Sequence, residues 1–342
     1  MSLLKPAISI VTPTFNRKDE LAHLINSLND QTLEPKYFEM IICDDGSTDG
    51  TEEHIKKWQM DVQFDIIYIF QKNLGPSFAR NKAVESSSGE LIVFTDSDCE
   101  ADKNWLKHIY ESYKKDNFDA FGGPDMAKDD FLPIQKAINF SMTSFFTTGG
   151  IRGHNSKMIA KFYPRTHNMG IKKKIFLKIG GFSSLRFGED IELSNRVHKS
   201  GANIKLLERA IVYHRRRTSL FKFFKQVYNS GVARINLAKR DSSMIEPIHF
   251  MPSILTIIAG LIILLATVYP ITFAPYLIIL ICSLILVSII GGFKEKTFKV
   301  VALLLMVMPF QIFGYGLGFI IAYIKRYILK HKEFSGFQRN FY

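Results

Sequence analysis

The sequence predicts an α/β fold with a mostly parallel sheet flanked by helices, followed by a C-terminal region of membrane-spanning helices. Two observations carry this prediction. Short apolar runs alternate with helix-patterned runs over about the first 210 residues, as in a parallel sheet covered on both faces. Two uncharged apolar runs then follow, residues 250–293 and 300–324. Because one helical span needs about 20 residues, the first run fits two helices and the second fits one.

The strands and helices are expected in strict alternation. Strands are expected at residues 7–12, 38–43, 64–70 and 91–95, with a later strand at 210–213. Helices are expected at 17–29 and 76–86. A helix between them is expected to be capped by Thr48 or Asp49 and to end at Trp58. In the first helix, Leu21, Leu24, Ile25 and Leu28 share one face, which predicts that this helix covers the sheet.

Charge is distributed unevenly along the chain. The formal net charge is +12, yet residues 1–210 hold 28 basic and 28 acidic side chains, whereas residues 211–342 hold 16 basic and 4 acidic ones. Positive charge beside long apolar runs indicates contact with anionic membrane lipids, and no nucleic-acid partner is expected. The three cysteines exclude a disulfide scaffold and lack the spacing of a zinc knuckle.

The sequence divides into four parts. They are an α/β domain at 1–217, amphipathic interfacial helices at 218–250, two to three transmembrane helices at 251–324, and a basic, aromatic tail at 325–342. The first apolar run is expected to turn from Tyr269-Pro270 through Pro275. The second run either spans the membrane or is broken by Pro309 and its glycines into a re-entrant segment, and both alternatives stay open.

The orientation follows from the lysines between the apolar runs. Lys294, Lys296 and Lys299 are expected on the cytoplasmic side by the positive-inside tendency. The sequence therefore predicts a multi-pass protein of the cytoplasmic membrane whose α/β domain faces the cytoplasm.

Polar clusters end three of the predicted strands, at residues 12–16, 44–49 and 96–100. Since ligands of parallel sheets bind at the carboxyl ends of strands, these clusters define a candidate site. On an extended segment, Asp96 and Asp98 point the same way, so both carboxylates can face one Mg²⁺ or Mn²⁺. The alternative is a solvated turn with ordinary acidic residues. The chain has neither a Gly-x-Gly-x-x-Gly nor a phosphate-loop motif, which argues against a dinucleotide-dependent oxidoreductase and a phosphate-loop ATPase.

Five short motifs follow one another along the first 193 residues. They are VTPTFN at 11–16, CDDGSTDGT at 43–51, NLGPSFARN at 73–81, DSD at 96–98 and GGFSSLRFGEDIEL at 180–193. With them, about residues 7–215 resemble a family-2 glycosyltransferase with the GT-A (nucleotide-diphospho-sugar transferase) fold. The membrane part resembles members that build lipid-linked glycans or exopolysaccharides of the cell envelope. The resemblance implies a UDP- or GDP-linked sugar donor and a lipid-linked acceptor.

The resemblance also implies residue roles. The nucleotide would contact Pro13, Thr14, Asp45, Gly75, Arg80 and Asp96, and the metal would be held by Asp98 with Asp96 and His214. For Arg80 the alternative is an ion pair with Glu85 or Asp44. For His214 the alternative is a packing or phosphate-facing role.

On the acceptor side, Asp190 is expected to be the catalytic base and Glu189 a supporting residue. Both open a helix, whose N-terminus favours the ionised carboxylate, although capping alone is an equal explanation of the residues themselves. The sugar, acceptor or diphosphate would be approached by Gly123, Asn168, Arg215, Gln226 and Arg234. Processive polysaccharide synthases carry a Gln-x-x-Arg-Trp motif. In this chain no Arg-Trp pair follows Gln226, so the motif is missing there.

Together these features predict an inverting, metal-dependent glycosyltransferase that moves a sugar from a nucleotide-sugar to a membrane-embedded acceptor, a lipid-linked glycan or polysaccharide precursor. A polyprenyl-phosphate sugar synthase is one alternative, in which the acceptor is a lipid phosphate that needs little help from a base. A non-catalytic membrane adaptor that keeps the nucleotide-sugar fold is another. The intact Asp96, Asp98 and Asp190 argue against an adaptor.

Overall fold

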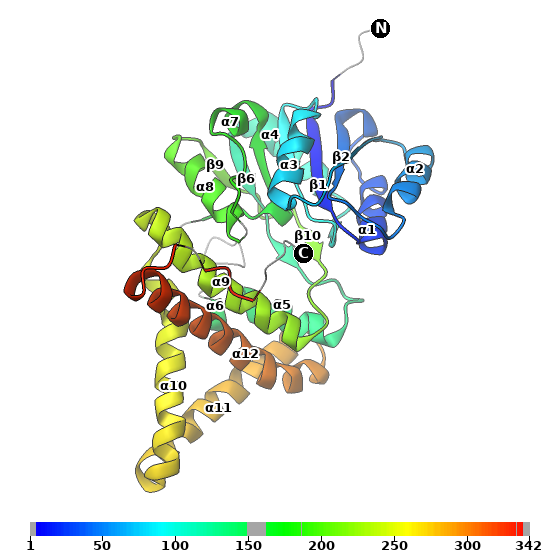
Figure 1. The fold of residues 1–342 in the computed structure, drawn as a ribbon. Helices are drawn as coiled ribbons and strands as arrows, with labels where there is room; N and C mark the ends of the chain where they lie inside the picture. The colour runs from blue at the N-terminus through cyan, green and yellow to red at the C-terminus, as the bar shows by residue number, and fades with distance from the viewer. Residues whose placement is uncertain (1–4, 149–161, 186, 333, 338–342) are drawn as a thin grey trace.

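In the computed structural model, which describes residues 5–148, 162–185, 187–332 and 334–337, an α/β domain sits on a set of long helices (Figure 1). Its main sheet has seven strands in the order β3-β2-β1-β4-β8-β6-β9. Their bounds are β1 Ile8–Thr14, β2 Phe38–Asp44, β3 Asp65–Phe70, β4 Leu91–Phe94, β6 Ala120–Gly122, β8 Met169–Lys172 and β9 Ile204–Leu206. A smaller sheet has the order β5-β10-β7, with β5 Cys99–Ala101, β10 Val212–His214 and β7 Asp125–Met126.

The pairing confirms a mostly parallel sheet. Strand β1 pairs in parallel with both β2 and β4, and β2 pairs in parallel with β3. Strand β8 is the exception, since it runs antiparallel to β4 and β6. The carboxyl ends of β1, β2 and β4 therefore meet at one edge, as the sequence predicted.

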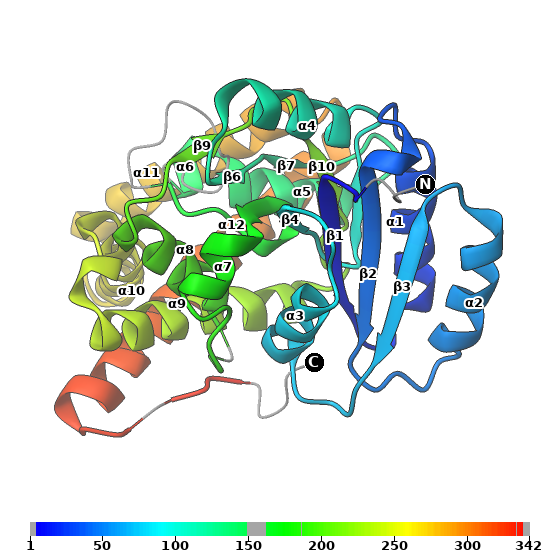
Figure 2. The same cartoon turned by 90° about the horizontal axis from the view of Figure 1, so that it is seen from above.

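Helices cover both faces of the sheet (Figure 2). The helices of the domain are α1 Lys18–Asn29, α2 Thr51–Asp61, α3 Pro76–Glu85, α4 Trp105–Asp116, α7 Lys173–Lys178 and α8 Glu189–Lys199, with short turns η1 Pro35–Tyr37 and η2 Thr166–Asn168. Side chains alternate across each strand, so Ile10 packs toward α1, α2 and α4 while Val11 packs toward α3, α7 and α8. This core on both faces of the sheet fixes the positions of the carboxyl ends of the strands, and therefore the position of the site.

The stretch expected as interfacial helices is mostly one long helix, α9 Leu220–Arg240, followed by the short turns η3 Ser242–Met244 and η4 Pro247–Phe250. Its residues Val227 to Asn229 and Gly231 to Ala238 are buried. They pack against protein, including Phe319 of α12. Two further helices complete this part of the structure: α5 Pro133–Thr143 packs against α12, and the short α6 Phe145–Thr148 follows it. Most of the apolar face of α9 thus contacts protein, and Phe221 in its first turn is exposed.

Three helices are long and apolar enough to cross a membrane: α10 Met251–Val268, α11 Pro270–Lys294 and α12 Phe298–Tyr323, which continues as the π-turn η5 Ile324–Ile328. Helices α10 and α11 form a hairpin that projects away from the α/β domain (Figure 1). The turn is shorter than expected, because Pro270 takes the first position of α11, where its missing N–H is harmless, and Pro275 lies inside the helix. Residues 333 and 338–342 of the predicted tail lie outside the described residues.

Candidate functional site

Asp45, at the end of β2, shapes one wall of the site. Its buried carboxylate accepts hydrogen bonds from the Gln71 amide at 2.6 Å and from the backbone N–H groups of Leu74 at 2.9 Å and Gly75 at 2.8 Å. Gly75 has φ of 101°, a conformation that side chains other than glycine rarely adopt. Asp45 therefore positions the loop before α3, and a direct bond from Asp45 to a nucleobase stays a prediction.

Two buried hydroxyl groups lie at the same edge. Thr14 ends β1 beside Pro13, and Ser77 lies in the first turn of α3. Within the part of the chain that the structure describes, their side-chain oxygens are buried and have no hydrogen-bond partner. Because such burial is costly unless a partner is supplied, these oxygens fit a bound polar group such as a nucleoside.

Arg80 links the strand ends to the later carboxylates. Its buried guanidinium lies 2.7 Å from Asp96 Oδ1 and 3.4 Å from Glu189 Oε1. It pairs with these two carboxylates rather than with Glu85 or Asp44. One arginine thus connects the side chain expected at the nucleotide with the pair expected at the acceptor.

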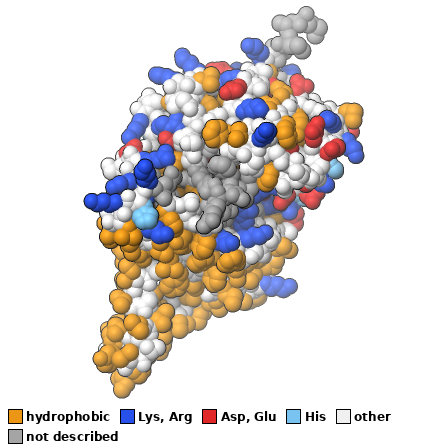
Figure 3. Space-filling view, in the orientation of Figure 1, with side chains coloured by type: hydrophobic (Ala, Val, Ile, Leu, Met, Phe, Trp, Pro, Cys, Tyr) orange, Lys and Arg blue, Asp and Glu red, His pale blue; other side chains and the backbone are white. Residues whose placement is uncertain are grey.

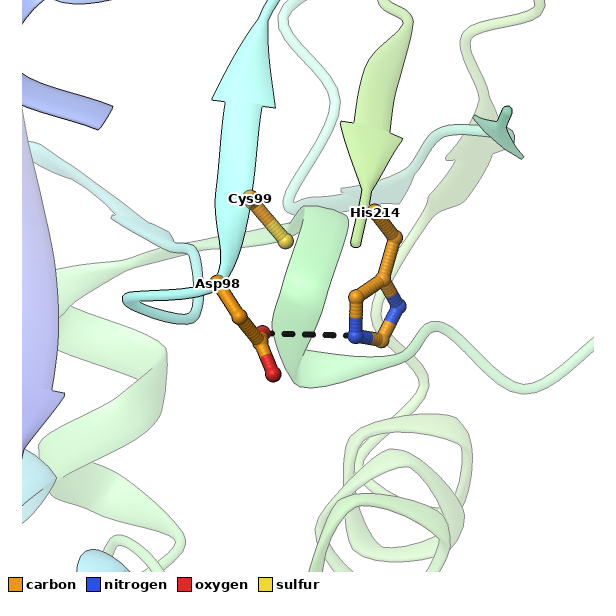
Figure 4. Close-up of side chains that lie close together, drawn as sticks. All are labelled: Asp98, Cys99 and His214. Atoms are coloured by element: carbon orange, nitrogen blue, oxygen red, sulfur yellow. Dashed lines mark ion pairs between the residues drawn. The ribbon is translucent and has the colours of Figure 1, made fainter. Parts of the chain in front are cut away.

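Asp98, Cys99 and His214 form the cluster of side chains that could hold a metal ion (Figure 4). The antiparallel pairing of β5 with β10 places His214 directly opposite Cys99, and therefore beside Asp98. Asp98 Oδ1 lies 3.3 Å from His214 Nε2, and the candidate ligand atoms of all three residues lie within 4.8 Å of one another. The structure brings Asp98 and His214 together as predicted.

Asp96 departs from its predicted place in this cluster. Residues 96–98 form a turn, closed by a hydrogen bond of 3.0 Å from the Cys99 N–H to the Asp96 carbonyl, rather than an extended segment. The rule that residues i and i+2 point the same way does not apply to a turn. The Asp96 carboxylate instead contacts Arg80, so Asp96 is not placed as a metal ligand.

The charges of the cluster suit a hard divalent cation. Burial opposes ionisation of Asp98, but His214 and Arg17 outweigh it and hold the Asp98 pKa well below its usual range. Burial lowers the His214 pKa, whereas the Asp98 carboxylate raises it, and the net result is a His214 pKa of about 8. Burial keeps the Cys99 pKa well above its ordinary value, so this residue stays a thiol. Asp98 Oδ1 is buried and receives no hydrogen bond from the described residues, and a divalent metal fits the Asp98–His214 pair.

Two residues that the sequence did not point to, Arg17 and Asp125, support this centre. Arg17, just before α1, pairs with Asp98 Oδ2 at 2.6 Å. The buried Asp125 pairs with Arg216 and lies 3.7 Å from His214 Nδ1. Asp125 thus stands behind the imidazole, in the position from which a carboxylate orients a metal-binding histidine. No short motif marks these residues, because their partners lie far away in the sequence.

Glu189 and Asp190 begin α8 after Gly188, whose φ is 79°. Arg165, also unmarked in the sequence, pairs with Asp190 at 3.1 Å. Burial disfavours the ionised form of Asp190, but Arg165 outweighs it and lowers the Asp190 pKa. Burial and then the neighbouring Asp190 raise the Glu189 pKa to about 7, against the opposite effect of Arg80. Two adjacent carboxyl groups therefore differ in protonation near neutral pH.

Asn168 and Gly123 both lie in the packed loop beside Ala210, and a contact of Gly123 with the sugar stays a prediction. The fully buried Asn168 side chain accepts from the Trp105 indole at 3.0 Å and donates to the carbonyls of Pro124 at 2.9 Å and Ala210 at 2.7 Å. A Cβ added to Gly123 would collide with Ala210 and Asn168. All the polar groups of the Asn168 side chain are engaged, so the expected contact of Asn168 with a sugar is not supported.

A cavity of about 300 Å³ opens beside Asp98. Its lining has an excess of basic over acidic side chains: Arg17, Arg215, Arg216, Arg217 and Lys222 against Asp19, Glu20 and Asp98. The guanidinium of Arg215 contacts Glu100 at 2.5 Å and lies over the Phe131 ring. Arg215 is therefore held by protein groups at the cavity wall, and its approach to a diphosphate stays a prediction.

Arg234 is likewise engaged inside the protein. It is buried between α9 and η3 and donates to the Met244 carbonyl at 2.8 Å, and burial lowers its pKa. Gln226, two turns earlier on α9, is partly buried. Neither residue is among those that line the described cavity beside Asp98, so the phosphate contact expected from this pair is not supported there.

Comparisons with known proteins agree with this architecture. The model of the family "Glycosyl transferase family 2" matches residues 9–188, more than half of the chain. TuaG of Bacillus subtilis, whose name assigns it to teichuronic acid biosynthesis, is 33% identical over 141 residues, which cover 41% of this chain and 55% of TuaG, about half of that relative's length. The glycosyltransferase AglE of Haloferax volcanii is 24% identical over 242 residues, or 70% of this chain and 77% of AglE.

Among solved structures, the mannosyltransferase PcManGT from Pyrobaculum calidifontis, in complex with GDP-Man and Mn²⁺, has a similar fold. The superposition covers 96% of this chain and 88% of PcManGT, with a TM-score of 0.67 and 16% sequence identity. The sheet order, the strand-end site and the family match lead to one conclusion: the chain belongs to glycosyl transferase family 2 and carries its GT-A fold.

Proposed function

We propose that this protein transfers a sugar from a UDP- or GDP-linked donor to a membrane-embedded acceptor, with inversion at the transferred carbon and with help from a divalent metal. The observation that carries the proposal is the arrangement of two charged centres around Arg80. On one side lies Asp96, with the Asp98–His214 pair close behind, and on the other lies the Glu189–Asp190 pair.

The first centre suits the donor. Asp98 and His214 would hold the metal, which when bound neutralises charge on the departing nucleoside diphosphate. Thr14 and Ser77 offer hydroxyl groups to the nucleoside, and Gly75 lets the backbone approach it closely. The basic side chains of the cavity beside Asp98 add positive charge for the diphosphate. Because imidazole suits Mn²⁺ better than Mg²⁺, we expect a preference for Mn²⁺.

The second centre suits the acceptor. Asp190 is ionised at neutral pH because it pairs with Arg165, so it can accept the proton of an acceptor hydroxyl. A single displacement needs one such base on the acceptor side, and that reaction inverts the transferred carbon. Glu189 lies beside it and contacts Arg80, which makes Glu189 a supporting residue that connects the two centres.

Relatives support this choice of substrates. PcManGT shares the fold and was solved with GDP-Man and Mn²⁺, which favours a nucleotide-sugar donor and a divalent metal here. TuaG is named for teichuronic acid biosynthesis, which favours an acceptor of the cell envelope. The apolar helices favour an acceptor held in the membrane, with the α/β domain on the cytoplasmic side next to Lys294, Lys296 and Lys299.

A polyprenyl-phosphate sugar synthase is the competing proposal. Its acceptor is a phosphate that is already ionised, so it would depend little on Asp190. The basic cavity beside Asp98 could accept a phosphate, and this observation favours the alternative.

Thermal unfolding of the purified protein against a panel of sugar nucleotides, each with Mn²⁺, Mg²⁺ or a chelator, tests the donor half of the proposal. We expect one UDP- or GDP-sugar to raise the melting temperature when Mn²⁺ is present, since a ligand that binds only the folded state stabilises it. A panel without any stabilising nucleotide sugar at millimolar concentration would contradict the proposal.

A further inference from the structure

We infer that α12 lies along the membrane surface rather than across the bilayer, so that the α10–α11 hairpin alone spans it. Length and composition make α12 a candidate span, but its neighbours place it differently. The inference concerns the surface that meets the lipid and stands apart from the proposed chemistry.

The first observation is that α12 crosses the base of the hairpin. In the C-terminal half of α12, an added Cβ at Gly316 would collide with Thr256, which lies in the second turn of α10. The Thr256 hydroxyl also lies 3.2 Å from the Ile312 carbonyl of α12. Near the N-terminal end of α12, Leu304 contacts Gly291 in the last turns of α11. The beginning of α10 and the end of α11 form the same end of the hairpin. A helix that touches both therefore runs from one to the other at one level.

The second observation is that α9 runs beside α12 on its other side (Figure 1). Phe223 of α9 packs in one cluster with Val300 and Leu304, and Lys239, near the other end of α9, lies 4.5 Å from the centre of the Tyr327 ring. The two helices are thus parallel over their whole length.

Their contact is close, because glycines occur on both sides of it. Added Cβ atoms at Gly231 of α9 and at Gly318 of α12 would collide with the backbone of the facing helix. Helix α9 carries Lys222, Lys225, Arg234, Lys239 and Arg240. If α12 crossed the bilayer, it would draw the charges of Lys222, Lys225 and Arg234 into the hydrocarbon, which is costly.

The third observation is the exposed face of α12. The exposed side chains of the helix lie three or four residues apart, or about two turns apart on the same face, and none of those between the lysines at 299 and 325 is charged: Ala302, Leu305, Met306, Phe310, Leu317, Tyr323 and Ile324. On the covered side, Ser141 of α5 donates to Gln311 at 2.5 Å. One apolar stripe opposite a covered face is typical of a helix that lies in the plane of the interface.

The stripe is continuous with the lipid-facing hairpin. Figure 3 shows apolar side chains from the tip of the hairpin up to its base, with basic side chains above them. The partner of the α12 stripe is therefore the acyl region just below the lipid headgroups. Lys299 and Lys325 then both reach headgroups from the same side as the α/β domain, which satisfies the positive-inside tendency at both ends of α12.

Cysteine labelling of the full chain in sealed proteoliposomes tests this arrangement. The background variant is Cys282→Ala, which removes the exposed thiol while the buried Cys43 and Cys99 remain. A membrane-impermeant maleimide added from the side of the α/β domain should label Phe298→Cys and Leu329→Cys, at the two ends of α12. Ile271→Cys, at the tip of the hairpin, should react only from the opposite side. Labelling of Leu329→Cys from the same side as Ile271→Cys would overturn the inference.

Spin-label depth gives a second, independent readout. Labels at Ala302, Met306, Phe310 and Leu317 should all lie at one shallow depth, as judged by their relative accessibility to oxygen and to a polar nickel chelate. Labels at residues 278, 281 and 285 of α11 are the matched control, and their depth should change steadily along that helix. A steady change of depth along α12 would show a spanning helix and contradict the inference.

Discussion

Asp98 Oδ1 lies 3.3 Å from His214 Nε2, and the pairing of β5 with β10 creates this contact. The two residues belong to distant parts of the chain, and each favours the charged form of the other. A metal that binds between them must displace the proton of His214, because only a neutral imidazole can be a ligand. Metal binding and protonation therefore compete at this position.

Mn²⁺ affinity should accordingly depend on pH. Because the His214 pKa is raised to about 8, affinity should increase between pH 6.5 and 8 and level off above that range. The increase should approach about tenfold per pH unit at the acidic end, where one proton is released for each metal bound. Free Mn²⁺ measured by electron paramagnetic resonance during titrations gives this slope. His214→Gln should bind Mn²⁺ weakly and without the slope, and a slope that survives in this variant would exclude His214 as the ligand.

The two aspartates of the DSD motif should differ in what they bind. Asp98→Asn removes a charged ligand, so it should weaken Mn²⁺ binding by at least about tenfold. Asp96→Asn should leave Mn²⁺ binding without nucleotide within a few-fold of wild type, because Asp96 contacts Arg80 instead. Isothermal titration with Mn²⁺ alone and then with donor separates these effects. Equal losses of metal affinity in both variants would contradict the placement of Asp96.

Substitution of Asp190 should separate chemistry from binding. Asn keeps the size of Asp and its ability to cap a helix, but it cannot accept a proton. Asp190→Asn should therefore lower transfer by about 10²–10⁴-fold while donor affinity and melting temperature stay nearly unchanged. Glu189→Gln is the matched control and should retain more activity than Asp190→Asn. Turnover of Asp190→Asn within a few-fold of wild type would favour the lipid-phosphate alternative.

The loop at Gly123 should tolerate no side chain. A Cβ there would collide with Ala210 and Asn168, so Gly123→Ala should destabilise the protein by roughly 1–3 kcal/mol. Gly260→Ala provides the same change in a helix with open space around it and should be neutral or slightly stabilising, because alanine is the better helix former. Thermal unfolding of both variants in the same detergent makes the comparison. Equal melting temperatures for the two would mean that the loop can move aside.

The sequence was informative where local patterns decide the structure. Apolar periodicity and strand-ending polar clusters located β1 to β4 and the edge where the site lies, because both signals come from neighbouring residues. The extended geometry assumed for Asp96 and Asp98 was wrong, because the segment at 96–98 is a turn and that geometry applies only to a strand. Asn168 and Arg215 are engaged by groups that the fold brings in from other elements.

Long-range partners could not be read from the chain. Arg17, Asp125 and Arg165 become recognisable only when pairing of distant elements brings them to Asp98, His214 and Asp190. Likewise, the composition of α12 gives its length and apolarity, but only its contacts with α9 and the hairpin base indicate its direction. Residues that act through a tertiary contact form no short motif, so the sequence alone does not identify them.

In the proposed function, this chain moves a sugar from a nucleotide onto an acceptor in the membrane. The most direct measurement follows radiolabelled sugar from a UDP- or GDP-linked donor into the organic-solvent extract of membranes that contain the protein. We expect label in that extract with wild type and Mn²⁺, and little label with a chelator or with Asp98→Asn or Asp190→Asn. Label that stays entirely in the aqueous phase with the wild type, for every donor that binds, would contradict the proposed function.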